Sequence, residues 1–242
     1  MPERAQRVMK RLRVEGSMPR SGRNITSVVS MGRRRADVRR DEILRAAAAV
    51  VGRQGFARTR AADVAAELGI STALVFYHFD SKERLLSEAF DLAAGEDLER
   101  LEKAVARNTD ATRRLRAVLR MYLPTGSGIG WARDIDAWAE GVFTPEIRDA
   151  CRRLDARWRA ALERVVADGV ASGEFTCDDP KAAALRIAVM LDGLGVAVQV
   201  RGTVGRTRSA RWIGEYAATQ LGLPAGALTP ATTVPRPTRP SP

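Results

Sequence analysis

The sequence predicts an all-α fold of about nine helices, in which a three-helix helix-turn-helix module is followed by a larger helical bundle. Alanine, arginine, leucine and glutamate are abundant, whereas aromatic residues make up only 5% of the chain and the alternation typical of strands is scarce. Apolar residues instead recur at helical spacing, as at Ile43, Ala47 and Val50. With 242 residues and 45% apolar content, the chain is long enough to bury a substantial core.

The stretch 59–86 has the pattern of two short helices around a tight turn, followed at once by a long helix. In the 20-residue window 61–80, the fifth, ninth and fifteenth places hold Ala65, Gly69 and Val75. These places need a small residue where two helices cross, a glycine at the turn and an apolar anchor. A second helix held in this way projects from the surface and fits the major groove of DNA, which is ~12 Å wide.

Capping residues and helix breakers set the expected bounds of the helices. The first helix is expected over 37–54, and Thr59, Ser71 and Ser81 are the expected N-caps of the next three helices. The helix after Ser81 is long and continues to about residue 105. Five further helices are expected at 111–123, 128–141, 145–172, 180–202 and 207–221.

Positive charge is concentrated at the two ends of the chain. The net charge is +11, and residues 1–35 alone carry +8, because they hold ten arginines and lysines against two glutamates. Residues 1–32 show no helical period and are expected to be a disordered basic extension. Residues 223–242 hold six of the eleven prolines and are expected to be a disordered tail. Charge placed beside a helix-turn-helix favours a polyanionic partner.

Other classes of protein and site are disfavoured. The two cysteines form no zinc or disulfide pattern, and the single histidine, His78, has no second ligand beside it, so no metal or cofactor is expected. No nucleophile–base motif or phosphate-binding loop is present, which argues against an enzyme. No apolar run reaches ~18 residues and the N-terminus lacks an apolar signal core, so we expect a cytoplasmic protein without a membrane partner.

Residues 59–86 resemble the TetR family of one-component repressors, and with the first helix the likeness covers about 37–97. The matching residues are Thr59, Val64–Ala65, Gly69–Ile70–Ser71, Tyr77–His78–Phe79, Ser81–Lys82–Glu83 and Leu85–Leu86. Two positions depart from the pattern, because the family often has glycine where Ala73 stands and tyrosine where Phe76 stands.

The second half of the chain is similar to the choline-responsive regulators of glycine-betaine synthesis. The likeness lies in Ala137–Trp138–Ala139, Arg152–Arg153–Leu154, Arg157–Trp158 and Leu191–Asp192–Gly193–Leu194. Together the two resemblances imply a ligand-responsive transcriptional regulator, a repressor that binds a palindromic operator in double-stranded DNA and is released by a small-molecule effector. They imply a DNA-binding domain at 33–97, with its motif at about 60–79, and a ligand-binding and dimerisation domain at 98–222.

Contacts to DNA are expected around the second helix of the motif. The resemblance implies phosphate contacts from Thr59, Tyr77–His78 and Lys82, and Ser71 at the start of the helix is expected to add one. Base edges are expected to be read by Arg60, Thr72 and Ala73. Two interpretations of Arg33, Arg34 and Arg35 remain open: they enter the minor groove as a flexible arm, or they belong to a disordered, solvent-exposed segment before the first helix. Phe76 and Phe79 are expected in the core.

The helices at 180–202 and 207–221 are the expected dimer interface, forming a four-helix bundle with the same helices of a second copy. Residues 185–200 are apolar nearly all round, so this helix packs against another chain or is a central core helix of its own. Two motifs on a dimer double the base contacts and require a palindrome.

An effector pocket is expected where large side chains gather before and within the helix 145–172. These side chains are Met121, Tyr122, Trp131, Ile135, Trp138, Phe143 and Trp158. Asp134, Asp136 and Glu140 lie among them, and aromatic faces with a carboxylate suit a cationic ligand. Arg133 and Arg148 would suit an acidic ligand instead.

The alternative function is that of a non-specific or architectural DNA-binding protein, which the basic ends favour. Such a protein shows a steep salt dependence without sequence preference. A repressor with six or seven phosphate contacts shows a log–log salt slope of about −6 together with a preferred palindrome.

Overall fold

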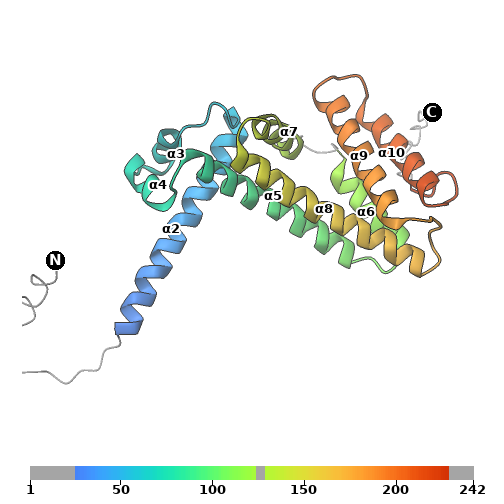
Figure 1. Ribbon diagram of the computed structural model, residues 1–242, viewed down its shortest axis with the longest axis horizontal. Helices are drawn as coiled ribbons and strands as arrows, with labels where there is room; N and C mark the ends of the chain where they lie inside the picture. Colours follow the sequence, from blue (N-terminus) through green and yellow to red (C-terminus); the bar gives the residue numbers. More distant parts are fainter. Residues whose placement is uncertain (1–24, 124–128, 229–242) are drawn as a thin grey trace, which may run out of the picture. The chain divides into compact units, whose positions relative to one another are not determined.

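The structure of the protein, a computed structural model, describes residues 25–123 and 129–228, with side chains described for 38–123 and 130–228. Within these ranges the regular structure consists of nine helices and no strand, so the all-α class is confirmed. The helices are α2 (Ile25–Gln54), α3 (Ala61–Leu68), α4 (Thr72–His78), α5 (Lys82–Ala106), α6 (Ala111–Tyr122), α7 (Ile129–Gly141), α8 (Pro145–Ala171), α9 (Pro180–Gln199) and α10 (Arg206–Gln220) (Figure 1). From α5 onward they begin and end within three residues of the expected bounds.

The chain divides into two compact units, residues 1–40 and residues 41–242. Of the first unit, the structure describes residues 25–40, which are the helical beginning of α2. The second unit contains the rest of α2 and every other described helix, and the candidate sites below all lie in it.

The helix α2 begins earlier than the sequence predicted. We expected disorder over 1–32 and a helix start at Asp37, whereas α2 begins at Ile25. The expectation is therefore wrong for residues 25–36, which contain no proline and a single glycine, Gly32, so that nothing in them stops a helix. Residues 1–24 lie outside the described part of the chain.

The beginning of the expected C-terminal tail is ordered. Leu228 is 4% exposed and belongs to the core of the bundle. The carbonyl oxygen of Ala227 accepts hydrogen bonds from Nε and Nη2 of Arg116 at 2.9 and 2.6 Å. The disorder expected over 223–242 is thus wrong for the residues up to 228, because an apolar side chain and a backbone acceptor hold them to the bundle. Residues 229–242 lie outside the described part.

The helix-turn-helix has a small apolar core of its own, formed by the end of α2, by α3 and α4, and by the start of α5. Its buried residues are Ile43, Leu44, Ala46, Ala47, Val50, Ala61, Val64, Ala65, Val75, Phe79, Leu85 and Ala89. Ala65 and Val75 are 3% and 0% exposed. Gly69, between α3 and α4, has φ 63°, a left-handed conformation that favours glycine. The three positions have the roles that their spacing predicted.

The remaining helices form a second, larger core. α5 and α8 run alongside each other, and α6, α9 and α10 complete the bundle (Figure 1). Among the described residues, α9 alone is long and apolar enough to span a membrane. It packs against α8 and α10 and buries Ile187, Leu191 and Leu194, which is the arrangement of a core helix, while Leu185 and Val189 on the same helix are exposed.

Candidate functional site

The helix α4 presents most of its surface to solvent. Ser71 caps it, because its hydroxyl oxygen accepts a hydrogen bond from the backbone N–H of Leu74 at 3.2 Å. Tyr77 is 80% exposed, and its ring stands edge-on to that of His78, with 5.2 Å between the ring centroids. Val75 and Phe79 are buried and fix the helix to the core. The cap and the anchor leave the opposite face of α4 accessible to a ligand as large as DNA.

Among the predicted base-reading and phosphate-binding residues whose side chains the structure describes, all but one are at least partly exposed. Arg60, Ser71, Ala73 and Tyr77 are exposed, and Thr72, His78 and Lys82 are half-buried. Arg33, Arg34 and Arg35 lie in helical backbone rather than in a flexible arm, and their side chains lie outside the described part of the chain.

Thr59 is the exception, since it is 0% exposed. Its hydroxyl donates a hydrogen bond to the carbonyl oxygen of Gly55 at 2.7 Å, so the expected phosphate contact is wrong. Nor does Thr59 cap α3: the N-cap is Arg60, whose backbone N–H bonds to the Asp63 carboxylate at 2.8 Å. That hydrogen bond lowers the pKa of the Asp63 carboxyl. Threonine is common at caps, but here its hydroxyl closes the turn before the helix.

Phe76 was expected in the core, but its side chain is 45% exposed. Phe79, three positions further on, is 1% exposed, as predicted. The difference arises because α4 offers only one buried face, which Val75 and Phe79 already occupy at i and i+4 spacing. Phe76 therefore lies beside the predicted base-reading residues.

A cavity of about 970 Å³ lies among helices α5 to α9. Five of the seven side chains predicted for an effector pocket line it, namely Met121, Tyr122, Trp131, Trp138 and Trp158. Ile135 does not line the cavity, and Phe143 is 85% exposed in the turn between α7 and α8, so both expectations are wrong. On α7, Trp131, Asp134 and Trp138 recur at helical spacing and share the face that the cavity meets.

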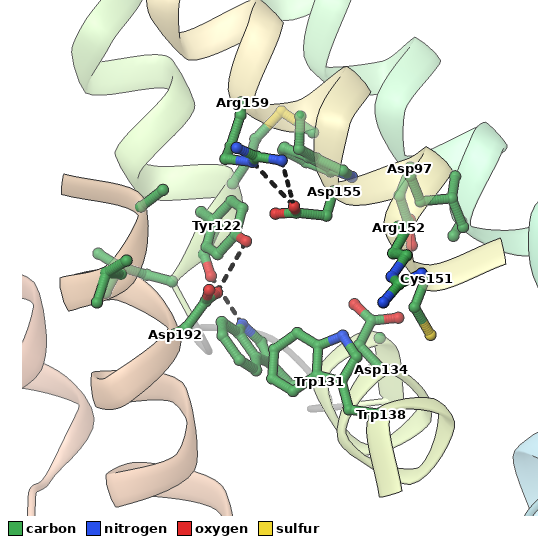
Figure 2. Close-up of a pocket in the computed structure, with 18 of the residues that line it drawn as sticks. Asp97, Tyr122, Trp131, Asp134, Trp138, Cys151, Arg152, Asp155, Arg159 and Asp192 are labelled. Atoms are coloured by element: carbon green, nitrogen blue, oxygen red, sulfur yellow. Dashed lines mark hydrogen bonds and ion pairs between the residues drawn. The ribbon is translucent and has the colours of Figure 1, made fainter. Parts of the chain in front are cut away.

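Four aromatic rings form one continuous cluster in the cavity wall. Tyr122 stands edge-on to Trp131 and to Trp158, with ring centroids 5.7 and 5.1 Å apart, and Trp131 stands edge-on to Trp138 at 5.9 Å. The indole N–H of Trp131 donates to the carbonyl oxygen of Tyr122 at 2.7 Å. This bond ties α7 to the end of α6 and fixes the ring at the edge of the cavity (Figure 2).

Asp192, on α9, is hydrogen-bonded to this cluster. The hydroxyl of Tyr122 donates to its Oδ1 at 2.9 Å, and Figure 2 shows the two side chains meeting beside Trp131. Within the described residues, no arginine or lysine forms an ion pair with Asp192. Burial raises the pKa of Asp192 to about 6, against the lowering effect of the Tyr122 hydrogen bond. Burial likewise raises the pKa of the Tyr122 hydroxyl.

The other acidic side chains of the cavity already have cationic partners. Arg133 bridges Asp97 and Asp134, with its Nη2 at 2.7 and 2.8 Å from their carboxylate oxygens. Asp155 pairs with Arg159 one turn along α8 at 2.8 Å (Figure 2). Asp192 is thus the acidic group of the cavity whose negative charge is not balanced by a paired arginine.

The two arginines that the sequence suggested for an acidic ligand do not line the cavity and are used inside the protein, whereas Arg100, Arg120, Arg152 and Arg159 do line it. Arg133 is held by the two aspartates and lies over the ring of Phe90, 5.7 Å from its centroid. Arg148 donates to the carbonyl oxygens of Gly141 and Val142 at 2.8 and 2.9 Å. Neither guanidinium offers its hydrogen bonds to the cavity.

Sequence reasoning missed Asp97, Asp155 and Asp192, which enter the cavity from α5, α8 and α9. For Asp192 a signal was present, because it is a single acidic residue inside an otherwise apolar helix. For Asp97 and Asp155 the sequence offers none, since each lies among other charged residues on a long amphipathic helix.

Comparisons with known proteins agree with this arrangement. Residues 111–222 match the model of the C-terminal domain of BetI-type transcriptional repressors, and residues 43–89 match that of bacterial regulatory proteins of the tetR family. A transcriptional regulator from Saccharomonospora viridis, solved in complex with choline, is 30% identical, and the match covers 70% of this chain and 89% of that chain with a TM-score of 0.63.

Two further proteins are similar to this chain. A TetR transcription regulator from Haloarcula marismortui has the same fold, with a TM-score of 0.68 over 76% of this chain and 99% of that chain, at 24% identity. The nucleoid occlusion factor SlmA of Vibrio cholerae is 25% identical over 130 residues, which are 53% of this chain and 66% of that protein. The chain belongs to the TetR family of DNA-binding transcriptional regulators, and its C-terminal domain is of the BetI type.

Proposed function

We propose that the protein is a cytoplasmic, homodimeric repressor that binds a palindromic operator through α4 and releases it when an organic cation enters the aromatic cavity. The observation that carries the ligand class is the unpaired Asp192 carboxylate beside Tyr122 and Trp131. A quaternary ammonium group attracts both a carboxylate and the faces of aromatic rings, at ~0.5–2 kcal/mol for each cation–π contact. The choline in the regulator from Saccharomonospora viridis belongs to this chemical class.

The DNA-binding part of the proposal rests on the exposed face of α4. The residues on this face are uncharged, namely Thr72, Ala73, Phe76 and Tyr77. The affinity for DNA would therefore come from phosphate contacts made beside this face. Lys82 and the backbone N–H groups at the start of α5 would supply these contacts.

The dimer part rests on α9 and α10. Four large apolar side chains on or next to these helices remain exposed in the single chain, namely Leu185, Val189, Val200 and Trp212. Pairing with a second copy would cover them and would place two α4 helices on one palindrome.

Calorimetry with three compounds tests the ligand class. Choline is compared with 3,3-dimethyl-1-butanol, its neutral isostere, and with a long-chain acyl-CoA. Binding of choline but not of the isostere is expected, because the isostere lacks the charge that Asp192 attracts. Asp192→Asn should weaken choline binding at least tenfold, whereas Asp178→Asn, at an exposed position between α8 and α9 outside the cavity, should not. Equal binding of the isostere and choline, or heat from the acyl-CoA alone, would reject the cationic ligand.

A competition gel shift tests the DNA part. DNA selected by the full chain from a random pool should contain a palindrome, and a scrambled version should compete at least a hundredfold less well. Equal competition by the scrambled DNA would favour the non-specific DNA-binding alternative.

A further inference from the structure

The helix α7 has contacts on two sides. One face carries Trp131, Asp134 and Trp138 into the cavity. Between them, Asp136 lies on a different face and does not line the cavity. Its Oδ2 accepts a hydrogen bond from the backbone N–H of Phe56 at 2.7 Å. Phe56 lies 80 positions earlier in the chain, in the corner that joins α2 to α3. The helix that forms part of the cavity wall is therefore tied directly to the helix-turn-helix.

The corner at Gly55 and Phe56 is closely fitted around the Asp136 carboxylate. Gly55 has φ 84°, and a Cβ at this position would lie 2.9 Å from Oδ2 of Asp136. Only glycine combines this backbone conformation with room for the carboxylate. The corner is also tied to the residues just before α3, because the carbonyl oxygen of Gly55 accepts a hydrogen bond from the buried hydroxyl of Thr59. A shift of Asp136 would therefore act on the turn that precedes α3.

The other side of the same corner is anchored to α5. The ring of Phe56 is 1% exposed and stands edge-on to that of Phe90, with 5.8 Å between centroids. Phe90 in turn lies beneath the guanidinium of Arg133, which is also on α7. An apolar contact thus holds the ring of Phe56, while the polar bond to Asp136 holds its backbone.

We infer that Asp136 is the positioning residue through which occupancy of the cavity sets the placement of α3 and α4. This inference rests on the proposed function, since it requires that a cavity ligand changes DNA binding. A ligand that contacts Trp131 and Trp138 shifts α7, and the Asp136 carboxylate carries the shift to the Phe56 backbone. The bond needs only an acceptor oxygen at this position, so an asparagine can replace the aspartate but an alanine cannot.

The first experiment measures operator affinity with and without choline chloride. The DNA is a duplex selected by the full chain from a random pool, and the proteins are wild type, Asp136→Ala, Asp136→Asn and the control Asp178→Ala, which lies at an exposed position outside the cavity. For wild type and the control, choline should weaken DNA binding by about 5–150-fold. For Asp136→Ala the weakening should fall to less than twofold while the choline Kd, measured by calorimetry, stays within threefold of wild type. Asp136→Asn should restore most of the response, which a loss of fold would not predict.

The second experiment needs no ligand and separates the inference from the proposed function. Trp131→Ala disturbs the cavity face of α7 directly, and its effect on operator affinity is measured alone and combined with Asp136→Ala. The inference predicts that Trp131→Ala changes operator affinity at least threefold in the wild-type background and less than 1.5-fold in the Asp136→Ala background. Additive effects would overturn it, as would an Asp136→Ala protein that binds choline and keeps the full response. If the wild-type protein binds DNA with the same affinity in the presence and absence of choline, the proposed effector is wrong. The double-mutant measurement then tests the inference by itself.

Discussion

Gly195 on α9 lies directly against the indole ring of Trp131 on α7, so closely that a Cβ at residue 195 would overlap the ring. The position of Trp131 in the aromatic wall of the cavity therefore depends on a glycine at residue 195 of the neighbouring helix α9. Because Trp131 also donates to the carbonyl oxygen of Tyr122, a displaced indole would lose that bond as well.

Gly195→Ala should accordingly distort the cavity. We expect a loss of ~1–3 kcal/mol in the free energy of unfolding from overpacking, and at least tenfold weaker choline binding because Trp131 leaves its place. Thermal denaturation and calorimetry measure the two effects. Gly52→Ala is the control: it lies inside helix α2, is exposed, does not line the cavity and would meet nothing within 4 Å. It should leave choline binding unchanged and stabilise the helix by up to about 1 kcal/mol. A Gly195→Ala protein with wild-type choline affinity would contradict the packing argument.

Ligand binding should depend on pH through Asp192. Its pKa is raised to about 6 in the folded protein, so a cation that needs the ionised carboxylate should bind about tenfold more weakly at pH 5 than at pH 7.5. The groups facing Asp192 are the Tyr122 hydroxyl on α6, Asp134 on α7, and the Asp155–Arg159 pair on α8. Calorimetry with choline across this range measures the effect. Asp192→Asn should bind weakly and almost without pH dependence, and an unchanged pH profile in that variant would assign the titration to another group.

The same shift predicts how stability depends on pH without ligand. The folded state holds a proton on Asp192 up to about pH 6, whereas the unfolded chain loses it near the ordinary value of 3.8. The stabilising contribution of this group is therefore fully present below about pH 4 and is lost as the pH rises to about 6. Urea denaturation of wild type and Asp192→Asn should show that the difference between their unfolding free energies varies with pH in this window and is constant above it. A constant difference from pH 4 to pH 7 would contradict the raised pKa.

Thr59 and Lys82 should differ in how they affect DNA binding. Thr59→Val removes the hydrogen bond to the Gly55 carbonyl and should lower the unfolding free energy by ~1–3 kcal/mol, but it should leave the salt dependence of DNA binding unchanged. Lys82→Ala should leave stability nearly unchanged and reduce the log–log salt slope by about 0.9, the value for one phosphate contact. Gel shifts at four salt concentrations distinguish the two. A reduced slope in Thr59→Val would return that residue to the phosphate-binding set.

Phe76 should contribute to base reading through apolar packing. Its exposed ring cannot form hydrogen bonds and lies beside Ala73, a surface suited to thymine methyl groups. Phe76→Ala should weaken operator binding about fourfold for each thymine methyl group that the ring covers in the wild-type complex, at ~0.8 kcal/mol per methyl. Replacing single thymines by uracil in the operator should weaken wild type but have less effect on Phe76→Ala. Phe143→Ala, a more exposed phenylalanine between α7 and α8, is the control and should not change DNA binding.

The sequence alone determined the features that depend on local periodicity. The spacing of Ala65, Gly69 and Val75 specified the helix-turn-helix, since a turn glycine and an apolar anchor act within a few residues of their own position. The sequence likewise grouped Trp131 and Trp138 among the side chains of one pocket, and both line the cavity.

The tertiary structure alone decided which side chains meet across the bundle. It buried Thr59, exposed Phe76 and Phe143, and brought Asp192 to the aromatic cluster without a cationic partner. It also set Gly195 against Trp131 and Asp136 against the Phe56 backbone. The physical reason is that burial, charge pairing and close packing depend on distances between segments that are tens of residues apart in the chain, and local residue patterns do not contain those distances.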